Sequence, residues 1–268
     1  MNQSVTKALG LLEFLAERKE LSLGDIARMA AIPKPTAYRL LTALEDMKFV
    51  RKIRYSDLDI RYQLGLKLLE LGTMVAEDME LRKVALSYMK ALCTEVEEVI
   101  HLVIRDGTEA VYIEKVESRQ PIRLHTRVGK RSPLYVGSGP KLLLAFMPDE
   151  ERHAYIETQS LDEINPRTIS NRDELSEEVR RIRQEGFATS DGEQDEDTIG
   201  ISFPVRDHRG EVVAALGVSG LKYRFSGSRF LTMKEKTGHM AELISKELGF
   251  VPLKNLSVRD TDDGRGGG

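Results

Sequence analysis

The stretch Leu21–Leu44, LSLGDIARMAAIPKPTAYRLLTAL, decides the fold of the first part of this chain. Its first half places apolar residues at three- and four-residue spacing, as one face of a short amphipathic helix does, and Ser22 or Asp25 can cap its start. Pro33 and Pro35 then interrupt the helix, although Pro35 suits a first helical position, where no backbone N–H is needed. A second apolar stripe follows at Ala37, Leu40, Leu41 and Leu44. The stretch therefore predicts two helices joined by a tight turn.

Two interpretations fit this helix pair. In a helix-turn-helix the second helix enters the major groove of DNA, and its outer face here offers Tyr38, Arg39 and Thr42. In an ordinary helical hairpin the same face is only solvated.

The residues that follow favour DNA binding. Residues 49–55 and 60–64 have the pattern of two short strands around a polar turn, so three helices and a hairpin together predict a winged helix-turn-helix. The hairpin is basic, and such a wing contacts the phosphate backbone. The predicted DNA-binding residues are Lys34, Thr36, Tyr38, Arg39, Arg51, Lys52, Arg54 and Arg61.

The distribution of charge along the chain also favours DNA binding by the N-terminal part. The 268 residues carry a net charge of −3, but residues 1–62 have 11 Lys and Arg against 8 Asp and Glu, a net of +3, and the remainder has 29 against 35, a net of −6. A basic N-terminal part fits a partner that presents phosphates. The single cysteine excludes an internal disulfide and suits the cytoplasm, and no apolar run is long enough to predict a membrane span.

The chain is predicted to have two domains. We expect a DNA-binding domain over residues 1–64, a linker helix over 65–80, a second domain over 81–250 and a disordered tail over 251–268. The linker has a leucine stripe, which indicates a dimerisation helix or, alternatively, packing on its own domain. From Val99 onward, alternating strands with an Asp106-Gly107 hairpin signal are mixed with helices. Strands are expected at 99–104, 111–113, 122–128, 187–189, 199–205 and 211–219, and helices at 140–146, 149–158, 173–185 and 228–248. The fold class is α+β with a largely antiparallel sheet.

Two segments of the second domain could bind a ligand. Residues 135–141, YVGSGPK, precede an apolar helix, and free N–H groups at such a start can bind a carboxylate or phosphate, although a plain helix start has the same pattern. Residues 191–197, DGEQDED, resemble a calcium loop, but Glu196 and Ser202 replace its required glycine and glutamate. An acidic loop over a pocket, or a solvated loop, fits better. The five histidines are scattered and no G-x-S-x-G or HExxH motif occurs, so we predict no catalytic residue, no metal site, no cofactor and no enzyme.

Short motifs in the expected order make the chain resemble the IclR family of bacterial transcriptional regulators from residue 4 to about residue 249. They are Ser4-Val5-x-Lys7-Ala8-Leu9, residues 32–41 (IPKPTAYRLL), 61–65 (RYQLG), Pro133-Leu134, Lys141-x-Leu143-Leu144-Ala145, 186–188 (GFA), 191–193 (DGE), Pro204-Val205-x-Asp207 and 212–220 (VVAALGVSG).

The resemblance implies a winged-helix domain joined by a helix to a GAF-like effector-binding domain. It implies a homodimer or dimer of dimers on a palindromic operator in double-stranded DNA, with a small organic acid or aromatic catabolite as effector. Family members hold the ligand carboxylate at a helix start, which matches Ser138 and Gly139, and complete the pocket at positions that match Ser190 or Asp191. The expected effector-binding residues are thus Ser138, Gly139, Asp191, Glu193, Gly200, Ile201, Gly217 and Ser219.

The sequence departs from the family pattern at three positions. Pro35 replaces a common serine, Gly217 lacks a hydroxyl that some members use, and Pro140 replaces a glycine and so removes one N–H group. The pocket would then hold its carboxylate with fewer donors, or favour a larger ligand.

We therefore predict an effector-responsive transcriptional regulator, repressor or activator, without a membrane partner. One alternative is a small-molecule sensor that acts through protein contacts. The other is a hydrolase that uses the acidic loop and a histidine.

Overall fold

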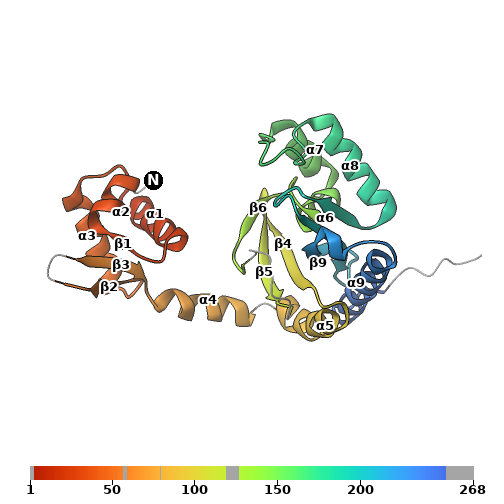
Figure 1. Cartoon of the computed structure of the whole chain (residues 1–268), viewed down its shortest axis with the longest axis horizontal. Coiled ribbons are helices and arrows are strands. Elements are labelled where there is room, and N and C mark those ends of the chain that lie inside the picture. The colour runs from red at the N-terminus through yellow and green to blue at the C-terminus, as the bar shows by residue number, and fades with distance from the viewer. Residues whose placement is uncertain (1–2, 57–58, 79, 119–126, 252–268) are drawn as a thin grey trace, which may run out of the picture. The chain divides into compact units, whose positions relative to one another are not determined.

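A computed structural model of the chain describes residues 3–56, 59–78, 80–118 and 127–251 (Figure 1). It divides into two compact units, residues 1–79 and 80–268, and each is described by itself. No helix in the described ranges is both long and apolar enough to cross a membrane.

The first unit is a winged helix-turn-helix. Its elements are α1 (Gln3–Glu17), β1 (Leu21–Ser22), α2 (Leu23–Met29), α3 (Lys34–Asp46), β2 (Val50–Arg54), β3 (Ile60–Leu64) and α4 (Lys67–Asp78). The strands form an antiparallel sheet in the order β1-β3-β2. Of the two expected caps, Ser22 is the one that acts, because its side chain accepts from the N–H of Asp25. Helix α3 begins at Lys34, one residue before the expected start at Pro35. Pro35 fits within the first turn because the first N–H groups of a helix have no intrahelical acceptor, so its missing N–H costs no hydrogen bond.

The core of this unit joins the predicted stripes of α2 and α3 to buried residues of α1 and of the wing. Leu11, Ile26 and Leu41 are almost completely buried, and Tyr62 of β3 closes the cluster. Where the wing leaves the sheet, a Cβ on Gly65 would lie 2.1 Å from the carbonyl oxygen of Lys48. Only glycine fits at this position.

The second unit is built on a six-stranded antiparallel sheet in the order β6-β5-β4-β9-β8-β7. The strands are β4 (Val99–Asp106), β5 (Glu109–Val116), β6 (Arg131–Pro133), β7 (Ala188–Asp191), β8 (Thr198–Arg206) and β9 (Val212–Leu221). The helices are α5 (Glu80–Val96), α6 (Ser138–Ala145), α7 (Asp149–Thr158), α8 (Arg172–Glu185), the 3-10 turn η1 (Lys222–Arg224) and α9 (Ser228–Glu247). The predicted α+β class with an antiparallel sheet is confirmed.

Helices cover both faces of this sheet. Helix α6, with α7 and α8 beyond it, lies on one side, and α5 and α9 lie on the other (Figure 1). Consecutive side chains of β8 point to opposite faces of the sheet and agree with this arrangement. Ser202 contacts Ser138 of α6, while the ring of Phe203 lies against Gly238 of α9. Residues of β4 are therefore buried on both faces.

The predicted elements of this unit are largely confirmed. Asp106 and Gly107 enter a tight hairpin turn with Gly107 at φ +62°, and α8 ends at Gly186 with φ +76°. Most of the strand predicted at 122–128 lies outside the described residues, as does the tail from 252, and residues 127 and 128 are not in a strand. Strand β6 was not predicted, because three residues are too few to show a period.

Candidate functional site

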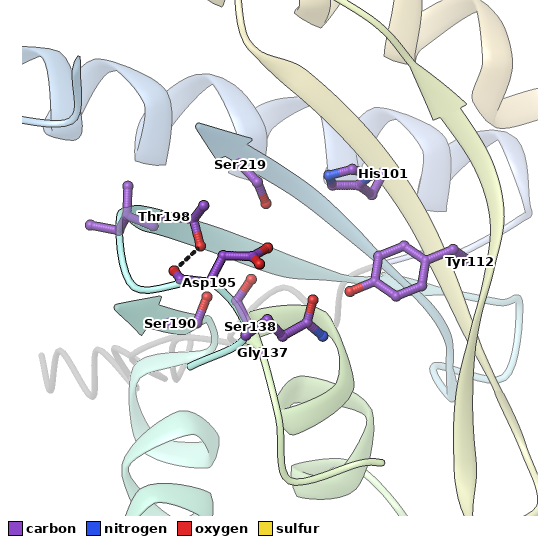
Figure 2. A pocket seen from close by; sticks show the side chains of 10 residues that line it. His101, Tyr112, Gly137, Ser138, Ser190, Asp195, Thr198 and Ser219 are labelled. Carbon is purple, nitrogen blue, oxygen red and sulfur yellow. Dashed lines mark hydrogen bonds between the residues drawn. The ribbon is translucent and has the colours of Figure 1, made fainter. Parts of the chain in front are cut away.

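A small polar pocket in the second unit lies where the start of α6 meets the strands and the loop of residues 191–198 (Figure 2). Its volume is about 40 Å³. The lining residues come from five strands, the start of α6 and the loop: His101, Tyr112, Gly137, Ser138, Ser190, Gln194, Asp195, Thr198, Ile199 and Ser219.

The start of α6 supplies two amide donors. Gly137 takes φ +97° to begin the helix, and its N–H donates to Oε2 of Glu193 at 2.7 Å. Pro140 has no N–H, and the N–H of Lys141 already donates to the carbonyl of Gly137. Within the described part of the chain, the N–H groups of Ser138 and Gly139 have no acceptor. Two unpaired donors at a helix N-terminus favour an anion.

Three serine hydroxyls converge beside these amides. A Cβ on Gly200 would lie 2.8 Å from Oγ of Ser138, 2.9 Å from Oγ of Ser190 and 3.1 Å from Oγ of Ser219. Figure 2 shows these side chains pointing toward one another from different elements. Gly200 is therefore needed for its lack of a side chain.

The space that a side chain on Gly217 would take is filled by a serine hydroxyl of the neighbouring strand. A Cβ on Gly217 would lie 2.6 Å from Oγ of Ser202, and that hydroxyl is 2.8 Å from Oγ of Ser138. Gly139 likewise sits close to Val103, at 3.2 Å from a hypothetical Cβ. These glycines give the strands and α6 room to approach, and neither of them lines the pocket.

His101 and Tyr112 form an uncharged wall of the pocket. Burial, with added repulsion from Lys115 and Lys130, lowers the pKa of His101 to about 3, so the imidazole is neutral at pH 7. Its Nδ1 is buried and finds no hydrogen-bond partner in the described ranges. Burial raises the pKa of Tyr112 to about 12, and the two rings meet edge to face at 5.5 Å. Sequence reasoning missed both residues, and the one available signal was a histidine within the apolar run IHLVI.

Two predicted effector contacts in the acidic loop are placed elsewhere. Glu193 is 6% exposed and turns its carboxylate to Lys141, at 2.5 Å, and not to the pocket. Asp191 lies on the outside of the loop, paired with Lys222 at 2.6 Å and Arg167 at 3.2 Å. Both were expected from the resemblance to the family, which does not tell which way each side chain turns.

Of the remaining expected effector residues, some line the pocket and others do not. Ser138 and Ser219 line the pocket, whereas Ile201 is fully buried in the sheet and does not. Asp195 lines the pocket in place of the expected carboxylates, and its carbonyl accepts a hydrogen bond from Oγ1 of Thr198 at 2.8 Å. In the described ranges, no group of three or more His, Cys, Asp or Glu side chains could hold a metal ion.

In the first unit, α3 and the wing present most of the predicted DNA-facing residues to solvent. Lys34, Tyr38 and Arg39 of α3 are exposed, and Thr36 is half-buried. In the wing, Arg51, Arg54 and Arg61 are exposed. Arg51 donates to Gln63, and the hydrogen bond with Asp59 raises the pKa of Arg61.

Lys52 differs from the other wing cations. Its Nζ lies 2.6 Å from Oε2 of Glu45, and this hydrogen bond raises the pKa of Lys52. The same ammonium lies 5.6 Å from the ring centroid of Tyr38 and 5.9 Å from that of Tyr62. Lys52 therefore connects the wing to α3 and is less available to phosphate than its neighbours.

Known proteins resemble the chain along nearly its whole length. Residues 73–246 match the model described as "Bacterial transcriptional regulator IclR C-terminal", and residues 4–54 match the "IclR helix-turn-helix domain". The HTH-type transcriptional regulator KipR of Bacillus subtilis is 35% identical over 93% of this chain and 98% of its own, and KdgR of Escherichia coli is 31% identical over 92% and 93%.

Solved structures agree with these relatives. The IclR of Thermotoga maritima superposes with a TM-score of 0.75 at 30% identity, over 93% of this chain and 100% of its own. An IclR homologue of Microbacterium hydrocarbonoxydans complexed with 4-hydroxybenzoate has a TM-score of 0.77 at 24% identity, over 91% and 98%, and supports the fold. With both units matched in order, the chain belongs to the IclR family of bacterial transcriptional regulators.

Proposed function

We propose that this protein binds a palindromic operator in double-stranded DNA through its first unit, under the control of a small carboxylate bound in the second. The observation that carries the proposal is the pair of unpartnered amide N–H groups at Ser138 and Gly139, at the helix start beside a polar pocket, in a chain whose other unit is a winged helix-turn-helix. A small-molecule site and a DNA-binding module in one chain fit a ligand-controlled regulator.

The DNA contacts divide by element. Lys34, Thr36, Tyr38 and Arg39 on α3 would face the major groove and its adjacent phosphates. Arg51, Arg54 and Arg61 on the wing would bind the backbone in a way that does not depend on sequence.

Helix α4 supports assembly of two or more chains. Within α4, Leu69, Met74 and Leu71 are 67%, 57% and 38% exposed, and Leu66, directly before the helix, is 75% exposed. Several exposed apolar side chains on a helix indicate a protein partner, and a second copy would also supply the second half-site contact of a palindrome. We infer a homodimer or a dimer of dimers.

The pocket favours a small acid. A volume of about 40 Å³ is far below the 300–1,000 Å³ or so of a site for a drug-sized ligand, so an aromatic catabolite would need the pocket to widen. With two amides and three serine hydroxyls as donors, a carboxylate of a few carbon atoms can be bound without a cation in the lining.

The DNA-binding half is tested by titrating the full chain against palindromes from its own upstream region, at several salt concentrations. Saturable binding that weakens steeply with salt is expected. If no such binding occurs, the chain acts as a sensor through protein contacts instead. The effector half is tested by a thermal-shift screen of organic acids, in which a ligand of the folded state raises Tm.

A further inference from the structure

A buried ion pair fixes the acidic loop to the helix that begins the pocket. Lys141 of α6 is 2% exposed, and its Nζ lies 2.5 Å from Oε1 of Glu193 and 2.8 Å from Oε1 of Glu178 on α8. Burial raises the pKa of the Glu193 carboxyl and the charge of Lys141 opposes this effect. Two charges removed from water persist only when each has close partners.

The second oxygen of Glu193 caps the helix. Oε2 accepts the N–H of Gly137 at 2.7 Å, which is the amide directly before Ser138 and Gly139. A charged acceptor makes this hydrogen bond one of the stronger kinds. Because successive amides at a helix start point in nearly one direction, fixing the first amide also orients those of Ser138 and Gly139, at the helix start beside the pocket.

The backbone of Glu193 is held as firmly as its side chain. Its carbonyl accepts from Nδ2 of Asn165 and from Oγ1 of Thr168, both at 2.9 Å. The next two residues, Gln194 and Asp195, line the pocket, whereas Glu193 does not. One residue thus joins the loop wall of the pocket to its amide donors.

We propose that Glu193 is a positioning residue for the effector site, acting through the N–H of Gly137 and through Lys141 without touching the ligand. The role assigned to Glu193 rests on the proposed effector function. The effect of Glu193 on the start of α6 can be measured with no ligand present.

Two double variants of the full chain separate positioning from mere stability. Lys141→Met with Glu193→Gln removes both charges and keeps an oxygen that can accept from Gly137. Lys141→Met with Glu193→Ala removes the same charges and the acceptor. Glu178 keeps Arg181 as a partner in both. Glu196→Ala, an exposed carboxylate on the same loop, is the matched control.

Hydrogen exchange of residues 134–146 is the deciding measurement. The variant without the acceptor is expected to exchange about 10-fold faster there than the variant that keeps it, and Glu196→Ala is expected to match the parent. The Kd for pyruvate, used as a three-carbon carboxylate probe, is expected to rise about 10-fold in the same variant.

Equal exchange in the two double variants would overturn the proposal, whatever their melting temperatures. If the exchange differs as expected but pyruvate does not bind the parent, the positioning role stands and the proposed class of effector is wrong.

Discussion

Gly200 shows how much of the pocket depends on one missing side chain. Its hypothetical Cβ would lie about 3 Å or less from three serine hydroxyls that come from α6, β7 and β9. Distances under 3.0 Å force at least one of those hydroxyls to move. The glycine is thus what lets three donors share one small volume.

We therefore expect Gly200→Ala to abolish the thermal shift caused by an effector carboxylate and to leave DNA affinity without effector unchanged. The reason is displacement of hydroxyl donors that each contribute roughly 0.5–1.5 kcal/mol. Gly10→Ala is the control, because nothing lies within 4 Å of its Cβ position. An unaltered ligand-induced shift in Gly200→Ala would show that the ligand binds elsewhere.

His101 makes stability depend on pH. Its pKa is about 3 in the folded chain, whereas a histidine in an unfolded chain has a pKa of about 6.5, so between these values the unfolded chain binds a proton that the folded chain does not. The contribution of neutral His101 to the free energy of unfolding is therefore fully present above about pH 6.5. It is lost as the pH drops toward 3, by roughly 2 kcal/mol between pH 7.5 and pH 5. His101→Gln should remove that part of the loss. Calorimetry at the two pH values checks it, and identical losses in both proteins would mean that His101 is not buried as a neutral base.

At the scale of elements, the wing is expected to supply affinity and α3 specificity. Arg51→Ala should weaken binding to operator and unrelated DNA alike, and should reduce the slope of log K against log salt by about 0.9. Arg209→Ala, an exposed arginine in the β8–β9 turn, is the control. Loss of preference at a single base pair, with an unchanged salt slope, would place Arg51 in the groove instead.

Elements long enough to show a hydrophobic period could be predicted from the sequence. Very short strands could not, and neither could the roles of residues on a strand that is covered by helices on both faces. The helices α2 and α3 followed from the stripe and the prolines, and the β4–β5 hairpin followed from Asp106-Gly107. Strands β1 and β6 have two and three residues, which carry no periodic signal. On β4, a strand covered on both faces, His101 looks like any core position.

The site was predictable only in part, for a related reason. The helix start at Ser138 has a local signature in its glycines and proline. The partners of that start come from positions far along the chain, such as the pairing of Lys141 with Glu193, which are 52 residues apart. The family resemblance gave Asp191 and Glu193 the same role, but in the structure Glu193 is buried and Asp191 is exposed.

At the scale of the whole molecule, the exposed side chains of α4 predict the assembly. Leu69→Glu places a charge in the proposed contact between chains and should convert the dimer or tetramer to monomers, with weaker operator binding. Light scattering coupled to size exclusion measures this directly. An unchanged mass for Leu69→Glu would mean that α4 is not the contact.

Control of DNA binding by a ligand in the second unit is tested by operator affinity with and without effector. The Kd of the full chain for its operator should be measured by fluorescence anisotropy, in the absence and in the presence of a saturating carboxylate that raises its Tm. A change of about 5- to 150-fold, in either direction, is expected for coupling between two sites. Gly200→Ala should show the same Kd with and without that carboxylate. An operator Kd that the bound carboxylate leaves unchanged in the parent protein would contradict ligand control.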